Sequence, residues 1–161
     1  MAESGEQFCF VNSYTHTIDA QRRIAIPSEW RSRDGETSFY LLPAKENIVQ
    51  LIPRETFYEQ VVRKAQKMSL ADARQNRDLA LYASRAQNCI CDKQGRIQIS
   101  QQLMEHGGFR DKIVLVGALS LIQLWTPERW EKALQDENND YFDVMQRISE
   151  IPEPAGDRKN E

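Results

Sequence analysis

Short runs of apolar residues, separated by turn residues, fill most of the first 125 positions of the chain, and several runs alternate apolar with polar side chains. Such alternation is typical of strands with one buried face. We expect strands at 8–18, 23–27, 38–42, 48–52, 86–91, 96–99, 112–116 and 121–125. Apolar residues at helical spacing, and helix-start residues, predict helices at 27–31, 53–67, 69–82, 101–106 and 140–149, with a further helix after Thr126. The mixture predicts an α+β fold.

Segments 17–26 and 90–99 are two copies of one element, set 73 residues apart. The offset pairs Asp19 with Asp92 and Arg23 with Arg96. It also pairs residues downstream: Gly35 with Gly108, Leu42 with Leu115, Gln50 with Gln123, and Phe57 with Trp130. Because one register holds over this length without an insertion, we infer a duplicated unit.

The duplication predicts how the chain is organised. We expect a first repeat at 7–67, a helical bridge at 68–83, a second repeat at 84–136, and a C-terminal helix with an acidic, disordered tail at 137–161. The bridge helix is expected to start with a capping box, Ser69 at the N-cap and Asp72 three residues later. Since a repeat of this size forms only a marginal core alone, we expect both copies to pack together as one pseudo-symmetric body.

The charge is unevenly distributed. The formal net charge is −3, but residues 128–161 hold five Lys/Arg against ten Asp/Glu, which leaves sixteen against fourteen in residues 1–127. A basic face is therefore permitted outside the C-terminal segment. No run approaches the ~18 apolar residues of a membrane-spanning helix. The first residues are acidic and lack the apolar stretch of a secretory signal, so we expect a cytoplasmic protein.

Residues with catalytic or metal-binding chemistry do not form motifs. Cys9, Cys89 and Cys91 form no C-x-x-C pair, and His16 and His106 stand alone. No nucleophile–base pair or phosphate-cradling glycine loop is visible. We therefore expect no enzyme activity, no metal site and no cofactor.

The repeated Asp-x-x-x-Arg turn has two interpretations. An aspartate favours turns because its carboxylate accepts bonds from nearby backbone N–H groups, and an arginine at the turn exit can pair with it. The turn is then a self-contained clasp. Alternatively, the clasp also directs guanidinium donors towards phosphates or base edges. Each turn carries a further cation, Arg22 in the first and Lys93 in the second, which favours anion binding.

The residues around the turns resemble a known family. The pattern Thr-Ile-Asp-x-x-x-Arg-Ile-x-Ile-Pro-x-x-Trp-Arg from position 17, with Asp-Lys-x-Gly-Arg-Ile-x-Ile from position 92, is similar to MraZ. So is the stretch Ile-Gln-Leu-Trp-x-x-Glu-Arg-Trp at 122–130. The resemblance covers about residues 13–134.

The resemblance implies an AbrB-like swapped-hairpin fold, with two tandem repeats forming one small pseudo-symmetric β-barrel and peripheral helices. It implies a transcriptional repressor of division and cell-wall genes, active at the nucleoid. Such a protein binds double-stranded DNA with short direct repeats as a ring-shaped homo-oligomer. No membrane and no small-molecule substrate is implied. The DNA-binding residues are expected to be Arg22, Arg23, Arg31, Lys93 and Arg96, supported by Asp19 and Asp92.

Two departures from the family pattern concern the turns. Gln21-Arg22 stands where the family usually has Lys-Gly, which puts a side chain where a positive φ is expected. In the second copy, Ser100 replaces the usual Pro and Met104 replaces Arg. We expect the first turn to bind more strongly, because the first copy retains Arg31 and has two adjacent arginines. The alternative function is a ring-forming structural or protein-interaction module of antitoxin-like type, using the acidic C-terminal segment.

Overall fold

The computed structural model describes residues 8–33 and 35–153, and the chain divides into two compact units, Met1–Pro127 and Glu128–Glu161. Each unit is described by itself. Most of the tail that was expected to be disordered lies outside the described residues.

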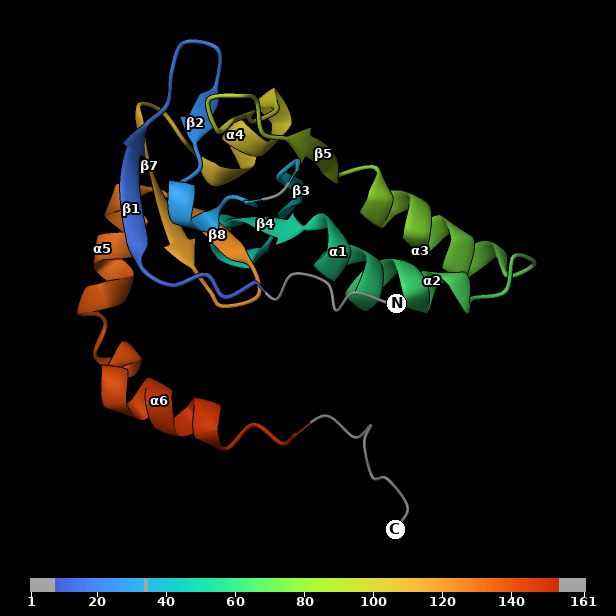
Figure 1. Ribbon diagram of the computed structural model, residues 1–161. Helices are drawn as coiled ribbons and strands as arrows, with labels where there is room; N and C mark the ends of the chain where they lie inside the picture. The colour runs from blue at the N-terminus through green and yellow to red at the C-terminus, as the bar shows by residue number, and fades with distance from the viewer. Residues whose placement is uncertain (1–7, 34, 154–161) are drawn as a thin grey trace. The chain divides into compact units, whose positions relative to one another are not determined.

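The first unit is built on antiparallel strands (Figure 1). Its strands are β1 (Ser13–Thr17), β2 (Arg23–Ala25), β3 (Ser38–Pro43), β4 (Val49–Pro53), β5 (Gln87–Ile90), β6 (Arg96–Gln98), β7 (Lys112–Gly117) and β8 (Ile122–Trp125). Six form a sheet in the order β1-β7-β8-β4-β3-β5, and β2 and β6 form a separate two-stranded ribbon. Strands were expected at all of these places, and the mixed α+β class is confirmed. Among the described residues, hydrogen bonds do not join the edge strands β1 and β5, so the sheet is not closed and the expected barrel is not confirmed.

The two sequence copies share these sheets rather than forming one each. Strand β1 pairs with β7, β3 with β5, β4 with β8, and β2 with β6, and each of these pairs joins the first copy to the second. The order is pseudo-symmetric, because β4 and β8 are counterparts at the centre and β1 and β5 are counterparts at the edges. Neither copy can therefore form its sheet alone.

The internal register is not uniform. Leu41 pairs with Leu51 and Leu115 with Leu124, so the structural counterpart of Leu115 is Leu41, at an offset of 74. The expected match of Leu42 with Leu115 is wrong, as is the absence of insertions. The connection between β6 and β7 is one residue longer than that between β2 and β3, and the next connection is one residue shorter. The shift is not visible in the sequence, because Leu41 and Leu42 are adjacent and either one can be aligned with Leu115.

One apolar core joins the ribbon to the sheet. Ile24 and Ile97 face each other across β2 and β6, and each is 1% exposed. They belong to one buried cluster with residues of the large sheet such as Leu51 and Leu124. Because side chains alternate along a strand, the neighbours of Ile24 and Ile97 lie on the outward face of the ribbon.

Helices fill the connections of the first unit. They are α1 (Arg54–Phe57), a π-helical turn (Tyr58–Val62) and α2 (Arg63–Gln66), which run on from one another, then α3 (Ala73–Ala83) and α4 (Gln101–Gly107), with 3-10 turns at Ser28–Trp30 and Lys45–Asn47. The expected capping box is wrong. Asp72 itself is the N-cap of α3, accepting a bond from the N–H of Gln75 at 3.0 Å, while the Ser69 hydroxyl accepts from Ala71 in the turn before the helix.

The described part of the second unit is mainly helical. Helices α5 (Pro127–Gln135) and α6 (Tyr141–Ser149) lie near the predicted positions, and the 3-10 turn between them (Glu137–Asn139) was not predicted. Asp140 caps α6 by accepting bonds from the N–H groups of Phe142 and Asp143. Tyr141, Phe142, Met145 and Ile148 remain exposed on α6.

Candidate nucleic-acid interface

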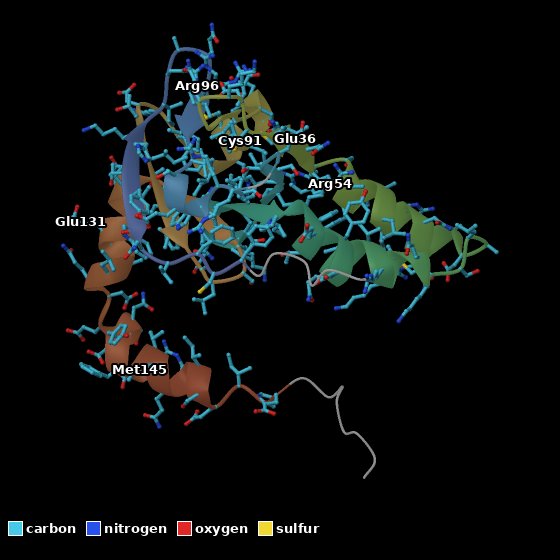
Figure 2. All side chains as sticks on the ribbon, in the orientation of Figure 1. Glu36, Arg54, Cys91, Arg96, Glu131 and Met145 are labelled. Carbon is cyan, nitrogen blue, oxygen red and sulfur yellow. The ribbon has the colours of Figure 1, made fainter. Side chains whose placement is uncertain are left out.

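The two repeated turns lie at opposite ends of the β2–β6 ribbon. Arg23, directly after the first turn, pairs with Gln98, whereas Arg96, directly after the second turn, pairs with Ala25. Both arginines are next to a buried isoleucine and therefore share the outward face of the ribbon. Figure 2 shows the side chains of this region, with Arg96 labelled.

The first turn is held by one carboxylate. Asp19 Oδ1 accepts the backbone N–H groups of Gln21 and Arg23, both at 2.9 Å. Asp19 Oδ2 accepts the Nε–H of Arg23 at 2.7 Å. The N–H of Arg23, followed by its side chain, stabilises the charged form and holds the pKa of Asp19 below its usual 3.8.

The second turn repeats this geometry. Asp92 Oδ1 accepts the N–H groups of Gln94 at 2.9 Å and Arg96 at 3.0 Å, and Oδ2 accepts the Nε–H of Arg96 at 3.0 Å. The pKa of Asp92 is lowered, again mainly by the backbone N–H of Arg96. The clasp interpretation is therefore correct for both turns.

Each clasp uses only part of its guanidinium. The side chains of Arg23 and Arg96 are 30% and 31% exposed, and only Nε bonds the aspartate. Within the described residues, no hydrogen bond or ion pair involves their Nη groups. The structure therefore permits the clasp and outward-directed donors at once.

Arg22 has the positive φ that its sequence position suggested. Its φ is 61°, and its counterpart Gly95 has a φ of 77°. The Nε–H of Arg22 donates to the carbonyl of Ile99 at 3.0 Å, and the N–H of Ile99 donates back to the Arg22 carbonyl at 2.8 Å. The equivalent backbone bond in the other turn joins the N–H of Ile26 to the Gly95 carbonyl. Arg22 thus ties the first turn to the end of β6.

Arg31 lies against the second turn, although it comes from the first copy. A Cβ on Gly95 would lie 2.7 Å from Cζ and 2.8 Å from Cδ of Arg31, and closer still to Nη1. The preceding Trp30 is 4% exposed and anchors this segment in the core, packing edge-on against Phe10. The Nε of Arg31 is buried without a hydrogen-bond partner in the described part of the chain. The expectation that Arg31 strengthens the first turn therefore loses its basis.

The remaining cation and one further contact complete the site. Lys93 is exposed at the tip of the second turn. Gln98, which no motif marks, donates from its side chain to the carbonyl of Gln21 at 2.9 Å and so braces the first turn from β6. Sequence reasoning missed Gln98 because its role follows from strand pairing alone.

The described residues contain no group of three or more His, Cys, Asp or Glu side chains suited to a metal ion. Within the same part of the chain, no helix has the length and apolar character needed to cross a membrane.

Comparison with known proteins gives consistent matches. The family model described as "MraZ protein, putative antitoxin-like" matches residues 9–81 and again 82–149. The protein named transcriptional regulator MraZ of Clostridium tetani is 32% identical over 142 residues, which are 88% of this chain and 98% of the relative. The protein of the same name from Lachnoclostridium phytofermentans is 36% identical over 137 residues, covering 84% and 94%. That of Finegoldia magna is 29% identical over 142 residues, covering 88% and 98%.

Proposed function

This chain belongs to the MraZ family, and on that premise we propose that it is a transcriptional regulator that binds double-stranded DNA through the two clasped turns of its β2–β6 ribbon. It acts in the cytoplasm, at the nucleoid, as a repressor. The names of its relatives support the regulatory role, and the geometry of the turns supports the contact.

The observation that carries the proposal is the partly used guanidinium at each end of the ribbon. Arg23 and Arg96 are held by their Nε atoms, and their partly exposed side chains keep Nη donors that the clasp does not use. Planar guanidinium donors suit phosphate oxygens and guanine edges, and a ribbon of two strands fits the major groove. Because each turn is already ordered, little conformational entropy is lost on binding.

Charge distribution is compatible with this surface. Residues 1–127, which contain both turns, hold sixteen Lys/Arg against fourteen Asp/Glu, while the acidic excess lies in residues 128–161. The exposed Lys93 adds a cation to the second turn. Phosphate contacts of this kind supply affinity, and base contacts supply sequence preference.

We further propose that several copies act together. One protomer with two small turns makes few contacts, so high affinity requires many turns along DNA with regularly spaced repeats. A ring-shaped homo-oligomer on short direct repeats meets this need. The strand pairs also fit the proposed swapped-hairpin architecture, because strands of the first repeat pair with strands of the second.

A mobility-shift titration tests the proposal with the full chain and the duplex directly upstream of its gene. We expect Arg23→Ala/Arg96→Ala to weaken binding at least tenfold, and to lower the log–log salt slope by about 0.9 for each phosphate that the variant no longer neutralises. Arg63→Ala/Arg77→Ala removes the same charge from exposed helical positions and is the matched control. If both double variants lose the same DNA affinity, the loss reflects net charge rather than the turns, and the proposal is refuted.

A second candidate function rests on α6. This capped helix leaves Tyr141, Phe142, Met145 and Ile148 exposed, which is typical of a surface that contacts another protein. A protein-interaction module of this kind would use the second unit rather than the turns. It is favoured if the arginine variants bind DNA like the parent while substitution on α6 changes the oligomeric mass.

A further inference from the structure

Each of the two turns has one arginine besides Arg23 or Arg96 close to it, but that arginine comes from a different position in each case. The second turn has Gly95, and the side chain of Arg31 from the other copy lies against it. The first turn has Arg22 at the position of Gly95, and Met104 occupies the position of Arg31. Arginine thus stands within the turn in the first case and in the segment that covers the turn in the second.

The equivalence of these positions does not depend on the letters alone. Arg22 and Gly95 both have a positive φ, and both carbonyls accept the N–H of the isoleucine that directly follows the neighbouring strand. Trp30 and Leu103, directly before Arg31 and Met104, are both buried. Later, Gly35 and Gly108 again share a positive φ, so the one-residue shift between the copies begins only after them.

Sterics explain why the substitutions occur together. A Cβ on Gly95 would overlap the distal atoms of the Arg31 side chain, so a side chain at this position would force the covering arginine to move. By the same geometry, a side chain at position 22 would displace an arginine at position 104. Met104 is partly buried and packs against the core, while the Arg22 side chain bonds the Ile99 carbonyl.

We propose that Arg22 supplies to the first turn the guanidinium that Arg31 supplies to the second, so that two arginines face DNA at each turn. The inference rests on the proposed function. The first turn presents Arg22 with Arg23, and the second presents Arg31 with Arg96. Arg22 is a positioning and specificity residue for DNA binding, with its Nε bonded to the Ile99 carbonyl and its Nη groups outside that bond.

An exchange of residues, measured with the full chain and its upstream duplex, tests whether Arg22 contributes to DNA binding. We expect Arg22→Gly to weaken binding roughly tenfold, and Arg22→Gly/Met104→Arg to restore it to within about threefold, by analogy with other arginine contacts. In Arg22→Gly, relief of the positive φ offsets the lost bond to the Ile99 carbonyl, so we expect a melting temperature close to that of the parent, and weaker binding would not reflect unfolding. The inference is overturned if Arg22→Gly binds like the parent, or if the double variant binds no better than Arg22→Gly.

Thermal unfolding without DNA tests whether side chains at positions 22 and 104 compete for the same space. We expect Met104→Arg to lower the melting temperature in the parent but not in the Arg22→Gly background, because only the parent has a side chain at position 22. Equal decreases in both backgrounds would overturn the inference. Should Met104→Arg fail to fold, the mirror exchange Gly95→Arg/Arg31→Met replaces it, with parent-like melting and binding expected and a decrease in either one counting against the inference.

The DNA-binding measurements separate this inference from the proposed function. If Arg23→Ala/Arg96→Ala leaves DNA binding unchanged, the proposed function fails whatever Arg22→Gly does. If that pair weakens binding but Arg22→Gly does not, the proposed function stands and only the role of Arg22 is wrong.

Discussion

Gly95→Ala is the most direct test of how the second turn is built. Gly95 has a φ of 77°, a conformation that costs an L-residue about 1–2 kcal/mol. The new Cβ would also lie 2.7–2.8 Å from Cζ and Cδ of Arg31, so the arginine must move away. The displaced aliphatic stem also loses buried contacts, and re-exposing about one CH₂ group costs about 1 kcal/mol. We expect a total destabilisation of about 2–3 kcal/mol.

Urea unfolding followed by circular dichroism measures this cost, and Gly35→Ala is the matched control. Gly35 has a φ of 95° but open space around its Cβ, so the control reports backbone strain without a clash. We expect Gly35→Ala to cost about 1–2 kcal/mol. At about 2–4 °C per kcal/mol for a chain of this size, Gly95→Ala should melt below the control by a few degrees.

A double-mutant cycle isolates the contribution of Arg31. In an Arg31→Ala background the clash is absent, and the cost of Gly95→Ala should fall to that of the Gly35→Ala control. Contacting residues show such coupling, whereas distant ones add independently. An unchanged cost of Gly95→Ala in that background would show that Arg31 does not cover the turn.

Three other predictions concern local features. The pKa values of Asp19 and Asp92 are lowered in the folded protein, so both carboxylates stabilise the fold above the ordinary carboxyl pKa and lose this effect as the pH falls below about 4. Compared with the parent, Asp19→Asn/Asp92→Asn should therefore have a lower urea midpoint at neutral pH and a midpoint that varies less as the pH falls. Parallel pH profiles of the two proteins would contradict this. Asp72→Ala should cost about 0.5–2 kcal/mol in urea unfolding through loss of the α3 cap, and no change would reject the cap. Burial raises the pKa of Cys91 to about 12, so at about pH 8 a thiol reagent should label the exposed Cys9 first and Cys91 only on unfolding; equal rates would exclude a protected thiol.

The sequence predicted features that depend on residues close together in the chain. The clasp of Asp19 with Arg23 spans four residues, and carboxylate chemistry and turn geometry determine it locally. The positive φ at Arg22 was likewise predictable from the glycine expected there. Strand positions followed from apolar runs bounded by turns, although β1 (Ser13–Thr17) is shorter than the expected 8–18.

Features that depend on distant pairing were not predictable. The shift between β3 and β7 appears only in the pairing register, because Leu41 and Leu42 are equally apolar. Arg31 was assigned to the turn of its own copy, since neighbours in sequence are the default neighbours in space. The antiparallel pairing of β2 with β6 instead brings the segment after β2 to the second turn. Exchange of strands between copies therefore also exchanges the side chains that cover the turns.

The clasp also explains why arginine, rather than lysine, follows each turn. The proposed function requires Arg23 to bond Asp19 and still offer donors to DNA, and a guanidinium can do both because its Nε and Nη groups point along different edges of one rigid plane. A lysine ammonium is a single centre, so a bond to the carboxylate would draw its whole charge into the clasp. The aspartate in turn fixes the guanidinium plane within the folded turn. Under the proposed function, the same side chain would therefore supply both order within the turn and affinity for DNA.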